Sequence, residues 1–305
     1  MPQWPKTHWS RLGVQRRPAS VSALLQEVSN LTVATGHRYV WRGVKDARYL
    51  LHSSLQRRLE HSGVPLEREA LAKGEATLVR QARDAGYGYR DGRELADGDL
   101  LALLQHAGAS TSLLDVTPDP FVALFFATEP RGEQKPCALI AIKVPGGTEA
   151  EQSRHTLKGP LPAGLWDDGE GAVPIGIYDR IRTSLDLPEE TSAPLLWEAP
   201  FVDDRMRAQR GMFLATTVPP AGVDFASFGV TLGSVEEEKA RVRHVCERDP
   251  GKYTRPALVV FYVSAKLRSA ATRELDRRFG YRTETIYPDL AGFAEANASN
   301  RSFGR

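Results

Sequence analysis

The sequence predicts an α+β fold in which a single mixed-sheet domain is flanked by helices. Segments with helical spacing of apolar residues alternate with short segments rich in β-branched and aromatic residues. No repeat and no low-complexity tract interrupts this order. The chain has 305 residues, of which 41% are hydrophobic and 26% are charged, a composition typical of a globular protein and not of a disordered one.

The first half of the chain is predicted to be mostly helical. Ser20 precedes apolar residues at helical spacing and Gly36 follows them as a C-terminal cap, which predicts a helix over residues 20–35. The aromatic and β-branched residues 38–42 favour a strand that ends at Gly43. Further helices are predicted at residues 65–85, 99–106 and 121–128, the last with Asp119 as N-cap and Pro120 in its first turn.

The second half is predicted to supply most of the sheet. Strands are expected at residues 137–144, 195–199, 212–218 and 257–264, the last apolar enough to be central. The Gly- and Pro-rich residues 145–194 are interpreted as an insertion, either a lid over a ligand or a dimer contact. A helix at 268–279, an edge strand at 282–287 and a short helix at 289–297 follow. We therefore expect an N-terminal helical extension at 1–35, a main domain at 36–296 and a flexible tail at 297–305.

Several function classes are disfavoured at this stage. The longest apolar runs, residues 121–127 and 257–263, have seven residues, whereas a membrane-spanning helix needs about 20. Cys137 and Cys246 lack metal-ligand spacing, and the absence of a signal peptide favours the cytoplasm. A net charge of +2 argues against a strongly basic DNA-binding domain, and no carboxylate cluster indicates a metal-dependent nuclease.

Although the net charge is low, local clusters of arginine are compatible with a phosphate-bearing ligand. Arg205, Arg207 and Arg210 form one cluster, and residues 266–282 form a mildly basic stretch whose default interpretation is a solvated helix face. The densest polar signal lies between two apolar helices, over residues 100–127. Its members are Gln105, His106, Thr111, Asp115 and Thr117. Polar side chains wedged between core elements either lock a connection or form a site.

A series of motifs in fixed order carries a family resemblance. The motifs are Trp41-Arg42-Gly43, Gln105-His106-x-Gly108, Thr111-x-Leu113-Leu114-Asp115-x-Thr117, Ala123-Leu-Phe-Phe-Ala127, Arg205-x-x-x-Gln209-x-Gly211-x-Phe213 and Tyr287-Pro288-Asp289-Leu290-x-Gly292. Together they resemble the FRG domain, a family named for its Phe-Arg-Gly motif, over roughly residues 36–296. Four positions depart from the family pattern: Trp41 replaces Phe or Tyr, Ala107 an aromatic residue, Ser112 an arginine and Val116 a tryptophan. Without the arginine at 112, the resemblance implies that a ligand is bound differently or more weakly.

The resemblance implies an ADP-ribosyltransferase-like layout, by analogy at the level of the fold. It implies an enzyme that uses NAD as substrate, an ADP-ribosyltransferase or NAD glycohydrolase without a metal. A bacterial toxin or phage-defence effector, with a nucleic-acid or protein acceptor and an antitoxin or regulatory partner, is the expected role. The alternative is a non-catalytic FRG module that binds nucleic acid or protein.

The resemblance also implies roles for individual residues. The catalytic set is Arg42, His106, Asp115 and Gln209, and the set that binds NAD is Trp41, Arg42, Gly43, Thr111, Ser112, Thr117 and Arg205. Arg42 would contact the pyrophosphate or a ribose, Gly43 would let the backbone approach, and Phe125 or Phe126 would stack on nicotinamide. Gln209 would stand where a glutamate normally stabilises the oxocarbenium-like state, unless Glu198, Asp203 or Asp204 supplies that charge.

Each of these roles has a structural alternative. Arg42 and Asp115 could form a buried ion pair, and His106 could be an interior histidine with satisfied hydrogen bonds. The phenylalanines at 121, 125 and 126 fit a buried helical face. Gln209 and Gly211 could mark the end of a helix that turns into a strand.

Overall fold

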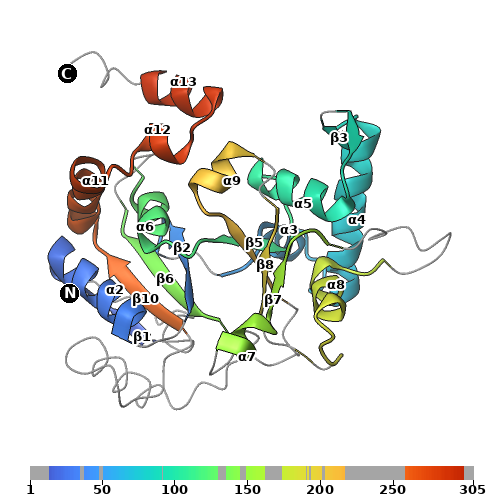
Figure 1. Ribbon diagram of the computed structural model, residues 1–305, viewed down its shortest axis with the longest axis horizontal. Coiled ribbons are helices and arrows are strands. Elements are labelled where there is room, and N and C mark those ends of the chain that lie inside the picture. Colours follow the sequence, from blue (N-terminus) through green and yellow to red (C-terminus); the bar gives the residue numbers. More distant parts are fainter. Residues whose placement is uncertain are drawn as a thin grey trace.

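The computed structural model has an α+β fold with mixed sheets, as the sequence predicts (Figure 1). It describes residues 14–34, 38–47, 51–90, 92–129, 135–144, 149–161, 174–189, 191, 194–200, 203–216 and 258–298. Within these ranges no helix is both long and apolar enough to cross a membrane. Residues 1–13 of the predicted N-terminal extension, and the predicted tail after residue 298, lie outside the described residues.

Two four-stranded sheets replace the single sheet that the sequence predicts. The first sheet has the order β1 (Val14–Arg16), β10 (Leu258–Val263), β6 (Cys137–Lys143) and β2 (Tyr39–Val44). The second has the order β5 (Leu113–Val116), β9 (Met212–Ala215), β8 (Leu195–Glu198) and β7 (Thr156–Lys158). Each sheet has one parallel pair, β1 with β10 and β7 with β8, and is otherwise antiparallel. The prediction that the strand near residue 260 is central is confirmed, since β10 lies between two neighbours.

Helices cover the outer faces of both sheets. α2 (Val21–Ala34), α6 (Pro120–Thr128) and α11 (Ala265–Phe279) pack on the first sheet, and α4 (Arg68–Asp84), α5 (Asp97–His106) and α8 (Ile177–Ser184) on the second. Figure 1 shows these two groups on opposite sides of the molecule. The remaining elements are α3 (Ser54–His61), the hairpin β3 (Tyr89–Arg90) and β4 (Arg93–Glu94), α7 (Glu149–Ser153), α9 (Asp204–Ala208), α12 (Thr283–Ile286) and α13 (Leu290–Ala298).

The alternation of side chains along the strands explains this layering. Leu139 and Ala141 of β6 belong to the core beneath the helices of the first sheet, whereas Ile140 and Ile142 belong to a second core shared with Leu114 of the second sheet. The order is therefore helices, sheet, sheet, helices. A third core lies between the second sheet and its helices.

Local signals fix several element boundaries as predicted. The Asp119 carboxylate accepts a hydrogen bond from the Phe121 amide at 2.8 Å, and Pro120 occupies the first turn of α6. The predicted edge strand at 282–287 is wrong, because this segment forms the short helix α12. Thr285 Oγ1 accepts from the Arg282 amide at 3.0 Å and donates to the Gly280 carbonyl at 2.8 Å, and these local bonds stabilise a turn of helix instead of a strand.

The segment interpreted as an insertion contributes to the fold where it is described. β7 pairs with β8 in the second sheet, and Ile177 and Ile181 of α8 are buried in the third core. At the N-terminus, Leu24 and Leu31 of α2 are buried in the first core. Both segments therefore pack against the same sheets as the rest of the chain.

Candidate functional site

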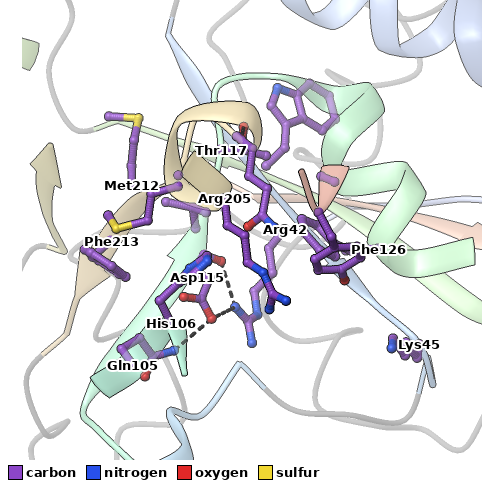
Figure 2. Close-up of a pocket in the computed structure, with 18 residues that line it drawn as sticks. Arg42, Lys45, Gln105, His106, Asp115, Thr117, Phe126, Arg205, Met212 and Phe213 are labelled. Atoms are coloured by element: carbon purple, nitrogen blue, oxygen red, sulfur yellow. Dashed lines mark hydrogen bonds and ion pairs between the residues drawn. The ribbon is translucent and has the colours of Figure 1, made fainter. Parts of the chain in front are cut away.

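The two sheets meet where their edge strands, β2 and β5, run side by side. The Trp41 amide donates to the Thr117 carbonyl at 2.7 Å, and the Thr117 amide donates to the Trp41 carbonyl at 2.9 Å. A cavity of about 280 Å³ lies at this junction (Figure 2). It brings together most of the residues singled out from the sequence, namely Trp41, Arg42, Gly43, His106, Asp115, Thr117, Arg205 and Gln209. Thr111 and Ser112 do not line it.

Arg42 extends from the face of β2 that points toward the second sheet. Its Nη1 donates to the Asp115 carbonyl at 2.7 Å, whereas the nearest Asp115 carboxylate oxygen is 3.8 Å away. The side chain is 20% exposed. Burial lowers the pKa of the Arg42 guanidinium, and the Asp115 charge offsets only part of this effect. The cavity wall thus contains a largely buried cation whose charge is incompletely neutralised.

Asp115 presents its carboxylate to the cavity from β5. Gln105 Nε2 donates to Asp115 Oδ2 at 2.8 Å, and the Thr111 hydroxyl donates to the Gln105 amide oxygen. Thr111 Oγ1 also accepts from the Leu113 amide at 3.1 Å. The Asp115 side chain remains 54% exposed. Arg42 and Asp115 therefore do not form the closed, buried ion pair that was the alternative interpretation.

Gln209 connects three parts of the cavity wall. It is the C-cap of α9 and is 8% exposed. Its Nε2 donates to the Ile286 carbonyl at 3.1 Å, and its own carbonyl accepts from the Thr117 hydroxyl at 2.9 Å. The side-chain amide is thus engaged with the backbone of α12. Gln209 thus lies at the end of α9, just before β9 begins at Met212, as the alternative interpretation expects.

The three other acids considered for this role lie elsewhere. Glu198 pairs with Arg38, and Asp203 accepts from the Met206 amide at 2.7 Å as the N-cap of α9. Asp204 is 76% exposed. Asp115 is the carboxylate among these candidates that lines the cavity.

Arg205 closes the cavity on the side of the C-terminal motif. Its Nη2 donates to Asp289 Oδ1 at 2.8 Å, its Nε donates to the second oxygen of the same carboxylate, and its guanidinium lies 5.2 Å from the centre of the Tyr287 ring. Asp289 also accepts from the Gly292 amide at 2.7 Å. The hydrogen bonds lower the pKa of Asp289 and raise that of Arg205. Most of the donor capacity of Arg205 is therefore used within the protein.

With this geometry in view, residues 37–135 match the family model of the FRG domain. This similarity to the FRG domain covers about a third of the chain. The match begins before β2 and ends after α6, so it contains Arg42, Gln105, His106, Asp115 and Thr117. The comparisons with curated proteins and with solved structures each found no match. α9 and the C-terminal motif, which complete the cavity, follow the matched residues.

The triplet Trp41-Arg42-Gly43 serves packing as well as the cavity. A Cβ atom at Gly43 would lie 1.9 Å from the Ala123 carbonyl oxygen and 2.6 Å from the Ala127 nitrogen, so β2 and α6 can approach only because this residue is glycine. Trp41 is buried and stacks on Phe261, with ring centres 6.1 Å apart. Both residues therefore support the first core.

The phenylalanines of α6 divide between core and cavity. Phe125 is buried in the first core, as the packing interpretation expects. Phe126 lines the cavity, and its ring centre is 6.1 Å from that of Tyr287. Phe126 is thus the phenylalanine of this pair that is placed to contact a ligand.

Ser112 has a different environment from the one expected. Its hydroxyl donates to Glu75 of α4, whose other carboxylate oxygen accepts from the Ile177 amide of α8 at 2.9 Å. Glu75 is buried, and this burial raises its pKa to about 7. The Ser112 hydroxyl is therefore directed at Glu75 and not at the cavity, unlike the prediction from the motif series. The sequence offered a signal for Glu75, which occupies the same helical face as Leu71 and Val79.

His106 ends α5 and lies in the cavity wall. Its side chain is 14% exposed, and Nε2 is 3.7 Å from Asp203 Oδ1. Within the described part of the chain this nitrogen has no hydrogen-bond partner. The expectation of an interior histidine with satisfied hydrogen bonds is thus not met.

In the structure, fewer arginines of the two predicted clusters are exposed and free of an acidic neighbour than the sequence suggests. Arg268 is 2% exposed, and its Nη2 donates to the Glu129 carbonyl at 2.7 Å while Nη1 donates to the Lys135 carbonyl at 3.0 Å. Arg207 lies 3.7 Å from Asp204 on the surface. Arg42 is therefore the cavity arginine with the least neutralised charge among the residues discussed.

Proposed function

We propose that this FRG-domain protein binds NAD in the cavity and cleaves the bond between nicotinamide and ribose, transferring ADP-ribose to an acceptor or to water. The observation that carries the proposal is the juxtaposition of Arg42 and Asp115 in one cavity. Arg42 is a largely buried cation with unused donors, and Asp115 is a half-exposed carboxylate oriented by Gln105. Binding an anion next to Arg42 would neutralise its charge.

The chemistry follows from these two charges. When the bond between C1′ of the ribose and the nicotinamide nitrogen breaks, its electron pair leaves with nicotinamide and positive charge develops on the ribose. The Asp115 carboxylate would stabilise that charge. An acceptor oxygen then forms the new bond to C1′ and releases its proton, for which His106 is the base in the cavity wall. Phe126 and Tyr287 supply aromatic surface against which a planar ring can pack.

The acceptor and the biological role complete the proposal. We infer a nucleic-acid or protein acceptor in the cytoplasm, and a role as a toxin or phage-defence effector under an antitoxin or regulatory partner. These parts rest on the family resemblance alone. The enzymatic part rests on the cavity and is tested first.

The test is to incubate the full chain with NAD and measure the release of nicotinamide. Arg42→Gln is expected to weaken NAD binding, and Asp115→Asn to reduce the rate by about 100-fold or more at saturating NAD, because an amide cannot neutralise the developing charge. Arg207→Gln, which changes an exposed arginine outside the cavity, is the control. A wild-type protein that neither binds NAD nor releases nicotinamide contradicts the proposal.

One observation favours the alternative of a binding module without turnover. The amide of Gln209 is neutral and is hydrogen bonded to the Ile286 carbonyl, so it adds no negative charge to the cavity. A binding module would retain NAD or a nucleic acid in a salt-dependent manner without releasing nicotinamide. Association with an oligonucleotide that is unaffected by changing both Arg207 and Arg210 would contradict the nucleic-acid form of this alternative.

A further inference from the structure

The two ring nitrogens of His106 have different surroundings. Nε2 is buried and has no hydrogen-bond partner among the described residues, although the ring belongs to the cavity wall (Figure 2). The nearest acidic oxygen to Nε2 is Oδ1 of Asp203, 3.7 Å away. Because Nε2 is covered, Nδ1 is the ring nitrogen that remains for a ligand. The imidazole ring therefore lies between a carboxylate and the cavity.

This arrangement favours one tautomer of the neutral imidazole. If Nε2 carries the hydrogen, a donor faces the Asp203 carboxylate, whereas without it the Nε2 lone pair faces a negatively charged oxygen at low exposure. The separation of 3.7 Å exceeds the usual hydrogen-bond length of about 2.9 Å by about 0.8 Å. Such contacts are often long in enzymes without substrate and shorten in the complex. The carboxylate thus holds the hydrogen on Nε2 and leaves the lone pair on Nδ1.

Asp203 is fixed in this place by the helix that follows it. It is the N-cap of α9, and its Oδ1 accepts from the Met206 amide at 2.7 Å. Its side chain is 23% exposed, so water screens its charge only in part. A carboxylate has about four lone-pair positions on its two oxygens, so the capping bond leaves room for a second donor. Capping α9 and orienting His106 are therefore compatible roles of one side chain.

We propose that Asp203 is a positioning residue that fixes His106 with the hydrogen on Nε2, so that Nδ1 is the base of the cavity. The inference rests on the proposed function, in which His106 takes the proton of the acceptor. In that step the acceptor oxygen forms its bond to C1′, its proton moves to Nδ1, and nicotinamide leaves with the electron pair of the broken bond. Both ring nitrogens then carry hydrogen, and the Asp203 carboxylate stabilises the resulting imidazolium through Nε2.

The test determines the tautomer of His106 by NMR in the full chain, with ¹⁵N-labelled histidine and without NAD. At about pH 8.5 an ordinary histidine is neutral, and the ¹⁵N shifts of Nδ1 and Nε2 show which nitrogen carries the hydrogen. The chain has seven histidines, so His106→Gln identifies the His106 signals by their loss. The wild type is expected to carry the hydrogen on Nε2 alone.

Two substitutions of Asp203 remove its charge and keep an N-cap, since asparagine and serine cap helices about as well as aspartate. In Asp203→Ser the shorter side chain cannot contact His106, so the hydrogen should exchange between both nitrogens and the two ¹⁵N shifts should approach each other. Asp203→Asn should show a smaller change, because its amide oxygen still accepts a hydrogen bond. Asp204→Asn is the matched control, because Asp204 is the next acid in the chain and is 76% exposed.

The outcomes of the NMR test are distinct. Exchange between tautomers in Asp203→Ser, with fixed tautomers in the wild type and in Asp204→Asn, supports the inference. A fixed tautomer that persists in Asp203→Ser, or exchange in the wild type, overturns it.

Nicotinamide release gives a second measurement that separates this inference from the proposed function. Asp203→Ser should lower kcat by at least about 10-fold and leave KM for NAD nearly unchanged, because Asp203 acts through His106 and does not line the cavity. A change in KM alone overturns the positioning role. A wild-type tautomer that Asp203→Ser releases, in a protein that does not cleave NAD, supports the orientation of His106 and contradicts the proposed enzyme.

Discussion

Arg42 and Arg205 line the same cavity from two regions of the molecule, and their surroundings differ. Arg42 comes from the wall formed by β2 and α6, where the contacts are a close approach at Gly43 and a stacked tryptophan. Arg205 comes from the wall formed by α9 and the C-terminal motif, where two hydrogen bonds to Asp289 hold the elements together. The first wall is held by close packing, and the charge of Arg42 is only partly neutralised. In the second wall, Arg205 is paired with Asp289, and this pair helps to hold the wall together.

This difference shows how one residue type takes opposite roles in one cavity. A bound anion adds little electrostatic stabilisation to an arginine that is already paired with a carboxylate. It adds much more to a buried arginine whose neighbours are a carbonyl group and a distant carboxylate. The comparison can be tested by substitutions in each wall, taken here from the largest expected effect to the smallest.

Gly43→Ala tests whether the first wall depends on shape. The new methyl group would meet backbone atoms of α6 that cannot move aside, so we expect a loss of at least about 3 kcal/mol in the free energy of unfolding, measured by denaturant titration. Gly211→Ala is the matched control in the second wall, because a Cβ there would lie 3.6 Å from its nearest neighbour, the Met206 carbonyl oxygen. Equal losses in the two variants would contradict a difference in packing.

Glu75→Gln tests the buried carboxyl behind the second sheet. Its pKa is raised from 4.5 to about 7 in the folded state, so the folded protein holds a proton that the unfolded chain releases. The contribution of Glu75 to stability is present below pH 4.5 and is lost as the pH rises from there through about 7. The glutamine variant should lack this decline, as measured by thermal unfolding across that range. If the stability of the wild type rises over the same pH range while that of the variant stays constant, the pKa of Glu75 is not raised in the folded state.

The pair of Arg205 and Asp289 tests whether the second wall depends on charge. A double-mutant cycle with Arg205→Gln and Asp289→Asn should give a coupling energy of about 1 kcal/mol, since the pair is two-pronged but partly exposed. Because the pKa of Asp289 is lowered, this contribution is present above the ordinary pKa of aspartate and is lost as the pH falls through the lowered value. A coupling energy of zero in urea titrations would show that the wall is held by other contacts.

Arg42→Gln should have the smallest effect on stability. Its charge is poorly compensated, so removing it is expected to change the free energy of unfolding by less than about 0.5 kcal/mol or to raise it slightly. Chemical denaturation without ligand measures this directly, with Arg205→Gln as the comparison. A loss in Arg42→Gln larger than that in Arg205→Gln would reverse the roles assigned to the two arginines.

The sequence predicts those parts of the fold that depend on local signals. Asp119 and Pro120 mark the start of α6, and the apolar run at β10 indicates a central strand. The motif order also predicts that Arg42 and Asp115 belong to one site, and both residues line the same cavity. The segment at 282–287 was mistaken for a strand because Thr285 forms side-chain bonds to nearby backbone that a β-propensity ignores.

The sequence predicts which residues lie near the cavity better than it predicts the directions in which their side chains point. Ser112 and Asp115 are three residues apart, yet one points to Glu75 in α4 and the other to the cavity. Which of the two faces a ligand depends on the tertiary position of α4, which periodicity does not supply. Gln209 likewise lies at the cavity, but its amide direction is set by the Ile286 carbonyl, 77 residues later in the chain.

The joint between the two sheets consists of the reciprocal hydrogen bonds between the backbones of Trp41 and Thr117. Because main-chain atoms form it, its geometry is independent of the side chains at these positions. The Trp41 side chain lies instead in the first core, where its ring stacks on that of Phe261. The same residue therefore holds the two sheets together through its main chain and fills the first core through its side chain.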